Sequence, residues 1–308
     1  LREVREVADR ITVIRRGKVV GEAQPGSSDA ELASLMVGRS VELVVAKGEP
    51  QFSDALLEVE NLEIVDRDGL VLVDDVSFEV RGGEILVVAG VQGNGQTELA
   101  ESLLGLVEPS SGSIRLDGVE LVGRSVDGFL REGIGFVPED RSVDGLVGTF
   151  TVAENLMLDR LDGPPFVKGA SLQIGARDEF ARRAVEEFDI RTQSIHAPAG
   201  RLSGGNQQKV VLARELSREL RLLVASQPTR GVDVGSIEFI HERIVATRDA
   251  GVPVIVVATE LDEALALADR ILVMYRGRIV GIVPADTPRD VLGLMMAGIA
   301  PEEGSKVA

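Results

Sequence analysis

Residues 84–106 read EILVVAGVQGNGQTELAESLLGL, an apolar run followed by a glycine-rich turn and a helix-like segment. The pattern is typical of a buried strand, a tight turn and a helix in succession. Gly90, Gly95 and Thr97 fit the phosphate-loop pattern G-x-x-x-x-G-K-S/T, but Gln96 stands where that pattern has lysine. Taken alone, the stretch is compatible with a phosphate site or with an ordinary glycine turn.

As a phosphate site, this turn would use backbone N–H groups and the positive N-terminal end of the following helix. Gln96 offers only a neutral hydrogen bond in place of a charge-assisted contact of about 1.5 to 3 kcal/mol. We therefore expect the loop to bind nucleotide weakly or not at all. The candidate nucleotide-binding residues are Gly90, Gly93, Asn94, Gly95, Gln96, Thr97, Glu98 and, from a later segment, Glu139.

The remaining strand patterns are of two kinds. Residues 56–65 and 71–80 alternate apolar and polar side chains, which is typical of a partly exposed antiparallel sheet. Continuous apolar runs at 84–90, 220–226 and 252–259 are typical of buried parallel strands. Helical patterns lie between them, at 177–188, 205–220, 236–249 and 261–270. The sequence thus predicts an α/β fold with a central parallel sheet and an antiparallel β layer.

Composition narrows the possible functions. The chain has 308 residues, a net charge of -17 and no cysteine, which argues against an electrostatic grip on nucleic acid and excludes disulfides and thiolate metal sites. Its apolar runs of about seven residues are far shorter than the roughly 20 that a membrane helix needs. The only histidines, His196 and His241, have no neighbour at metal-ligand spacing, so we interpret both as surface or helix-capping residues and expect no metal site formed by the chain alone.

The beginning of the chain repeats a segment near its end. LREVREVADRITVIRRGKVVGE, from Leu1, aligns without a gap with LDEALALADRILVMYRGRIVGI, from Leu261. A period of about 260 residues corresponds to a whole domain, although two similar units could also arise by chance. We interpret the chain, which starts without methionine, as a fragment of a longer one. The expected parts are the end of one domain at 1–38, a linker at 39–55, a complete homologous domain at 56–285 and a C-terminal helix and tail at 286–308.

The apolar stripe of the first part, formed by Val4, Val7, Ile11 and Val13, would need a surface to cover it. We expect this part to be disordered, to pack on the complete domain, or to pair between chains.

RLSGGNQQKVVLARE, residues 201–215, is the most specific motif. Together with GFVPEDR before it, ASQPTRGVDVGS after it and VVATELDEA further on, it resembles the nucleotide-binding domain of ATP-binding cassette (ABC) transporters. The resemblance covers essentially the whole chain and implies a P-loop NTPase fold with a helical subdomain at about 151–219. PEDRSVDGL and TVAENLML resemble the second cassette of double-cassette ATPases that energise simple-sugar import, whereas GVQGNGQTEL and IEFIHERI are more similar to the nucleoside branch.

Several residues depart from the family pattern. Ser226 and Gln227 stand where the family has the aspartate that holds magnesium and the glutamate that polarises the attacking water. Thr259 replaces the switch histidine, and Glu139 replaces the glutamine of the magnesium-sensing loop. A lost general base alone lowers a rate about 10²- to 10⁴-fold, and the missing lysine acts on the same phosphoryl transfer. We therefore predict that the fragment alone does not hydrolyse ATP.

In this family two cassettes pair head to tail, so the signature of one closes over the nucleotide of the other. Asp233 stands in the loop that crosses this interface. The resemblance therefore implies that this chain contributes to a composite site for ATP and Mg²⁺ held by a first cassette of the same polypeptide. The signature residues that would act there are Leu202, Ser203, Gly204, Gly205, Asn206 and Gln207.

The resemblance also implies partners and a location. A coupling helix of a membrane permease subunit would dock near the Glu139 loop, with Phe150, Leu156 and Met157 as candidate contacts, and an extracytoplasmic substrate-binding protein would act indirectly. The chain would then lie on the cytoplasmic face of the cell membrane. An alternative function is a non-catalytic nucleotide-sensing or scaffolding module. A soluble cassette protein of DNA repair or translation is disfavoured by the acidic charge and the absence of zinc cysteines.

Overall fold

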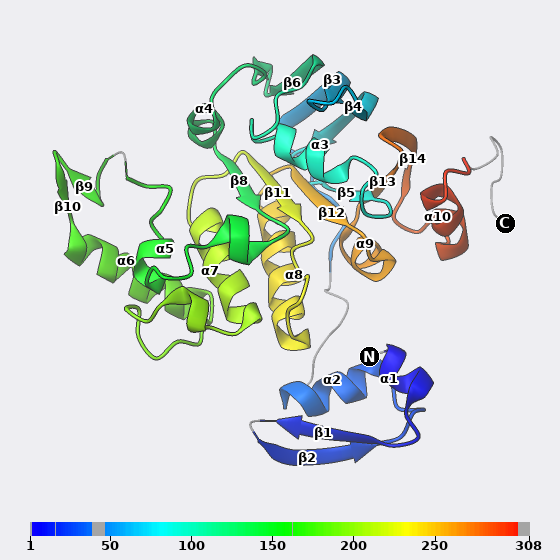
Figure 1. Cartoon of the computed structure of the whole chain (residues 1–308), viewed down its shortest axis with the longest axis vertical. Coiled ribbons are helices and arrows are strands. Elements are labelled where there is room, and N and C mark those ends of the chain that lie inside the picture. Colours follow the sequence, from blue (N-terminus) through cyan, green and yellow to red (C-terminus); the bar gives the residue numbers. More distant parts are fainter. Residues whose placement is uncertain (1, 16, 39–46, 162, 301–308) are drawn as a thin grey trace.

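The computed structural model describes residues 2–15, 17–38, 47–161 and 163–300, and its centre is a six-stranded sheet (Figure 1). The strand order is β14-β13-β5-β12-β11-β8, in which all neighbouring pairs are parallel except β13 with β14. The three continuous apolar runs form β5, β11 and β12, and every residue of these strands is buried. The bounds are β5 (Ile85–Ala89), β8 (Ile134–Val137), β11 (Leu222–Ser226), β12 (Val254–Ala258), β13 (Arg270–Tyr275) and β14 (Arg278–Pro284).

A second sheet of four antiparallel strands, in the order β4-β3-β6-β7, covers one face of the first. Its inward side chains, among them Val59 and Ile114, pack with Leu86 and Val88 of the central sheet in one apolar cluster. The predicted architecture of a parallel sheet with an antiparallel layer is therefore confirmed. The strands are β3 (Leu56–Val65), β4 (Val71–Arg81), β6 (Ser111–Leu116) and β7 (Val119–Glu120).

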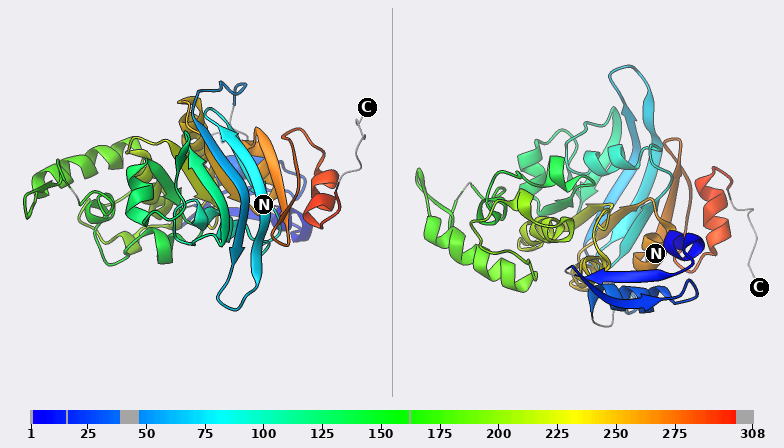
Figure 2. Two further views of the ribbon diagram at one scale, coloured as in Figure 1. Left: turned by 90° about the horizontal axis from the view of Figure 1, so that it is seen from above. Right: turned by 60° about the horizontal axis from the view of Figure 1, so that its bottom comes forward.

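α3 and α4 pack on the same face as the antiparallel layer, whereas α5 to α10 cover the other face of the sheet and extend to one side of it (Figure 2). The apolar face of α6, with Ala181, Ala184 and Phe188, joins the cluster that underlies β5, β11 and β12. The helical patterns read from the sequence correspond to α6, α7, α8 and α9. The bounds are α3 (Gln96–Ser102), α4 (Val126–Arg131), α5 (Val152–Asn155), α6 (Ile174–Glu187), α7 (Gly204–Leu216), α8 (Val234–Asp249), α9 (Leu261–Leu267) and α10 (Arg289–Met296), with the small hairpin β9 (Val167–Lys168) and β10 (Ser171–Leu172).

The N-terminal segment forms its own small unit, α1 (Arg2–Val7), β1 (Ile11–Arg15), β2 (Lys18–Ala23) and α2 (Asp29–Val37), and α2 lies against α8. Of the three expected placements, the structure has the one in which this segment packs on the larger domain. The predicted single apolar stripe is wrong, because only Ile11 and Val13 enter the small core. Val4 and Val7 are 45% and 84% exposed, since they lie on α1, outside the hairpin.

The expected linker is described only from Lys47 onward, and residues 39–46 lie outside the described part. Lys47 Nζ pairs with Asp269 at 2.8 Å, and the buried Arg248 donates to the carbonyl of Gly48 at 3.0 Å. The end of the linker is thus attached to the domain that it precedes. Of the C-terminal tail, residues 301–308 lie outside the described part. Within the described ranges, no helix is both long and apolar enough to cross a membrane.

Candidate functional site

The glycine-rich turn between β5 and α3 adopts a conformation that requires its glycines. Gly93 and Gly95 have φ angles of 86° and 98°, and a Cβ on Gly95 would lie 2.4 Å from the carbonyl oxygen of Leu72. Asn94 braces the turn from inside, because its Oδ1 accepts the N–H of Arg276 at 2.7 Å and its Nδ2 donates to Val91 O at 2.8 Å. The strand, turn and helix predicted from the sequence are therefore present.

Gln96 lies inside this loop and does not point out of it. Its side chain is buried, its Oε1 accepts the N–H of Asn94 at 3.1 Å, and its Nε2 donates to Val91 O at 3.2 Å. A Cβ on Gly90 would lie only 2.3 Å from that Nε2, so the carboxamide fills the space beside the first glycine. The side chain at the lysine position thus stabilises the loop with neutral hydrogen bonds and presents no charge to a phosphate.

The other substituted positions meet next to the loop. Ser226 ends β11, is 2% exposed, and its Oγ has no hydrogen-bond partner within the described ranges. Gln227 has a positive φ of 44° and donates its N–H to Val257 O at 2.8 Å, and its Oε1 accepts from Thr259 Oγ1 at 3.4 Å. The structure brings these three residues together, and none of them supplies a carboxylate.

A cleft of about 430 Å³ opens beside Thr97 and Ser226. Glu139 lies at its edge, where it accepts from Gln92 Nε2 at 3.1 Å and forms an ion pair with Arg230. Four further charged residues line this cleft and were not predicted, because they come from three separate segments that only the fold brings together. They are Glu101, Asp140, Asp144 and Arg230.

Glu101 in this cleft provides a pH-dependent test of the geometry. Burial, reinforced by Glu98, Asp144 and Glu139, raises the pKa of Glu101 above its usual 4.5. Because the pKa of Glu101 is raised in the folded state, the protonated carboxyl contributes to the free energy of unfolding. This contribution is lost as the pH rises through the folded-state pKa and the carboxyl loses its proton. We expect Glu101→Gln to raise the Tm by about 1 to 2 °C at pH 8 and by less as the pH approaches 4.5. Calorimetry at several pH values measures this, with Glu108→Gln outside the cleft as the control, and a gain of equal size at every pH would contradict it.

The signature segment forms the first turn of α7 and does not line this cleft. Ser203 is the exposed N-cap of α7, and its Oγ accepts from Asn206 Nδ2 at 2.8 Å. Asn206 Oδ1 in turn accepts the N–H of Arg191 at 2.7 Å, and Gln207 donates to Ala199 O at 3.4 Å. None of residues 202–207 is among the described residues that line the cleft beside the phosphate loop.

The two signature glycines have no room for a side chain. A Cβ on Gly204 would lie 2.4 Å from Arg141 Nη2, and one on Gly205 would lie 2.1 Å from Ser236 Oγ. Asp233 is the N-cap of α8, where Oδ1 accepts the N–H of Ser236 at 3.1 Å and Oδ2 accepts its hydroxyl at 2.8 Å. Signature and interface loop are therefore packed together, with Leu202 half-buried beside the core.

The interpretation of His241 as a surface or helix-capping residue is wrong. His241 lies in the middle of α8, is 3% exposed, and places Nε2 3.7 Å from Glu263 Oε1. The packing of α8 against α7 and β12 buries it, which no local pattern reveals. His196 is exposed, as expected, with Nε2 3.6 Å from Asp178. The described residues contain no group of acidic or histidine side chains arranged to hold a metal ion.

Two of the three candidate permease contacts are also wrong, because Leu156 and Met157 are 0% and 3% exposed. Phe150 remains exposed.

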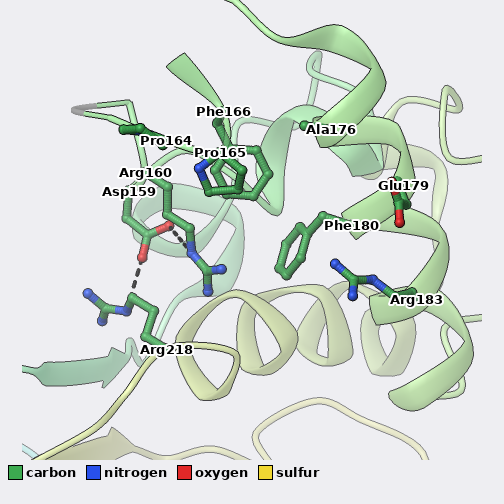
Figure 3. Close-up of a pocket in the computed structure, with 10 residues that line it drawn as sticks. All are labelled: Asp159, Arg160, Pro164, Pro165, Phe166, Ala176, Glu179, Phe180, Arg183 and Arg218. Carbon is green, nitrogen blue, oxygen red and sulfur yellow. Dashed lines mark ion pairs between the residues drawn. The ribbon is translucent and has the colours of Figure 1, made fainter. Parts of the chain in front are cut away.

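The helical segment at 151–219 carries a pocket of about 510 Å³ between the end of α7 and α6, shown in Figure 3. There, Arg218 Nε lies 3.1 Å from Asp159 Oδ2 and the Arg160 guanidinium stacks over Phe180 at 4.7 Å.

Burial, together with Glu215, raises the pKa of Asp159 in this pocket, although Arg218 and Arg160 act in the opposite direction. The pocket is distinct from the cleft at the phosphate loop.

The comparisons with known proteins agree with this geometry. The family model of ABC transporters matches residues 73–230. Three relatives are the nucleoside import ATP-binding protein NupA of Lactococcus lactis (46% identical over 300 residues), the guanosine import ATP-binding protein NupO of Bacillus subtilis (41% over 302) and the ribose import ATP-binding protein RbsA 1 of Rubrobacter xylanophilus (40% over 301). Each alignment covers 97% of this chain but only 59% of the relative, so the chain spans well under two thirds of their length.

Solved structures show the same fold. The dimeric post-hydrolysis structure of the ATP-binding cassette MJ0796 with ADP and Pi has a TM-score of 0.65 at 21% identity, covering 75% of this chain and 100% of that one. The ADP conformation of the cassette MJ1267 has a TM-score of 0.64 at 21% identity, covering 79% and 98%. The chain therefore has the P-loop NTPase fold of ABC cassettes.

Proposed function

The chain belongs to the ABC transporter family, and from this premise we propose that it is the second, degenerate cassette of a double-cassette importer ATPase. The observation that carries the proposal is the contrast between its two motifs. The signature segment is complete and presents Ser203 at the surface, whereas the phosphate loop holds a neutral Gln96 folded into itself. Such a chain contributes to ATP hydrolysis through the signature.

Its own nucleotide site lacks the groups that phosphoryl transfer needs. Catalysis of this step depends on positive charge at the phosphates, a bound Mg²⁺ and a group that orients the attacking water. Gln96, Ser226 and Gln227 are all uncharged, and Thr259 only bonds to Gln227. We infer that this site binds ATP weakly or not at all, and that the ATP and Mg²⁺ used for turnover are held by a first cassette of the same polypeptide.

The internal repeat supports the assignment of residues 1–38 to the end of that first cassette. At equivalent positions of the repeat, Ile14 is 67% exposed and Met274 0%, while Val7 is 84% exposed and Leu267 0%. In the second copy β13 lies between β14 and β5, whereas β1 pairs only with β2 among the described strands. Val7 and Ile14 of the first copy are therefore exposed at positions that the central sheet of a first cassette would cover. On this basis the second cassette spans 56–285, with 39–55 as the linker and 286–308 as the C-terminal helix and tail.

The names of the relatives support a role in nucleoside or simple-sugar import, since they refer to nucleosides, guanosine and ribose. An importer ATPase needs membrane permease subunits, which would attach this chain to the membrane, and a substrate-binding protein outside it. Two features are available for permease docking, the exposed Phe150 just before the helical segment at 151–219 and the pocket around Phe180 within it. The choice between nucleoside and sugar resides in those partners.

Comparing ATP hydrolysis by this chain with that of the full-length protein tests the proposal. We expect the chain alone to hydrolyse ATP at least about 100-fold more slowly than the full-length protein, because its own site lacks the charged groups. A Mg²⁺-dependent phosphate-release assay at saturating ATP measures both rates. Comparable rates would sink the asymmetric arrangement.

A further inference from the structure

Arg141 joins segments that lie far apart in the sequence. Its guanidinium donates to Arg230 O at 2.7 Å and to Gly231 O at 3.1 Å, both in the loop after β11. A Cβ on Gly204 would meet Arg141 Nη2 at 2.4 Å and Gly231 O at 2.9 Å. The guanidinium therefore fills the space between that loop and the first turn of α7, directly against the signature backbone.

The partners of Arg141 are unusual for an arginine. Both of its hydrogen bonds go to backbone carbonyls, and within the described part of the chain no carboxylate lies at salt-bridge distance from it. Its Nε is buried and has no hydrogen-bond partner among the residues that the structure describes. A planar guanidinium can bridge two neighbouring carbonyls with one rigid group, which the ammonium of lysine does not reproduce. The geometry of this position thus favours arginine over lysine.

The segment that carries Arg141 also reaches the phosphate loop. Two residues earlier, Glu139 accepts from Gln92 of that loop and pairs with Arg230. On the other side, Asp233 caps α8 where a Cβ on Gly205 would lie 2.6 Å from its Oδ2. The segment with Glu139 and Arg141 is thereby in contact with the phosphate loop, the interface loop and the signature at once.

We propose that Arg141 is a positioning residue for the signature segment. It holds the first turn of α7 in register with the loop at 230–231 and connects both to the segment that carries Glu139. The inference rests on the proposed function, in which the signature completes a nucleotide site held by another cassette. Arg141 does not touch that nucleotide, and its loss displaces the groups that do.

The test is steady-state ATP hydrolysis by the full-length protein carrying Arg141→Ala or Arg141→Lys. We expect kcat to fall about 10- to 100-fold in both, because small displacements of catalytic groups have effects of this size. KM for ATP should stay within about twofold, since interactions made only in the transition state affect kcat. Guanidinium at about 20 mM should restore part of the activity of Arg141→Ala and none of that of Arg141→Lys. Arg124→Ala is the control, because Arg124 also donates to a carbonyl, that of Glu120, in a distant loop.

Wild-type kcat in Arg141→Ala, or a loss that guanidinium does not reverse, would overturn the proposal. Hydrogen exchange provides a second measurement on the same variants. The amides of 204–207 and 230–233 should exchange faster in Arg141→Lys while the central sheet is unchanged, and unchanged exchange in those segments overturns the proposal as well. If Ser203→Glu abolishes turnover and Arg141→Ala does not, only this inference fails; if Ser203→Glu is fully active, the proposed function fails.

Discussion

Ser203→Glu in the full-length protein is expected to lower ATP turnover by about 100-fold or more, the loss found when one group that stabilises transition-state charge is removed. Ser203 is exposed at the N-terminus of α7, where backbone N–H groups and the helix end favour an anion. A carboxylate at this position would occupy that anion site and repel the γ-phosphate that the signature is proposed to meet. The measurement is phosphate release at saturating ATP, with the variant's Tm checked by calorimetry.

Gln96→Lys is the matched control for this prediction. It restores the charge of the phosphate loop, but the proposed function expects a metal anchor, a base and a switch that Ser226, Gln227 and Thr259 do not provide. Turnover should therefore stay within about twofold of the unmodified protein, because one restored group does not assemble the phosphoryl-transfer site. The opposite pattern, an active Ser203→Glu and a strongly stimulated Gln96→Lys, would reverse the assignment of the two motifs.

Asp269→Ala is expected to destabilise the fold by about 3 to 5 kcal/mol, because it removes a buried carboxylate from an ion-pair network. The Asp269 side chain is 8% exposed, pairs with Arg248 at 3.1 Å and Lys47 at 2.8 Å, and accepts the N–H of Ile85 at 2.8 Å. Arg248 itself is 1% exposed. Urea unfolding of this chain measures the difference, and the main transition should shift to lower denaturant.

The repeat supplies the control for that measurement. Asp9 occupies the position equivalent to Asp269 but is exposed in the N-terminal unit. Asp9→Ala should change the stability by less than about 0.5 kcal/mol, as surface substitutions usually do. Equal losses in the two variants would mean that the aspartates act through local structure, and that the network around Arg248 has little influence on stability.

The position of Gln96 illustrates where prediction from sequence succeeds and where it stops. Glycines at 93 and 95 are required by positive φ angles, so the turn and the helix after it could be predicted locally. The loss of lysine was equally visible. The inward hydrogen bonds of Gln96 to Asn94 and Val91 were not, because a side chain of this length could have pointed to solvent.

Other residues were beyond prediction for the same reason. His241 has no motif, and only the packing of α8 within the domain buries it, with Glu263 nearby. Leu156 and Met157 have the composition of a docking surface, yet they are buried in the domain's own core. Arg141 stood in a motif that indicated the family, while its contacts with a loop about 90 residues away had no sequence signal.

The sequence by itself determined the α/β fold, the position of the phosphate loop, the completeness of the signature and the substitutions on which the proposal of a deficient phosphate loop rests. Hydrophobic periodicity and the backbone conformations that require glycine depend on only a few neighbouring residues. These features can therefore be predicted from short stretches of the sequence. Only the tertiary structure decided that Gln96 turns inward, that Arg141 lies against Gly204 and that α2 packs on α8. Those contacts depend on how distant segments meet, and a buried polar group takes whichever partner the fold brings within hydrogen-bond distance.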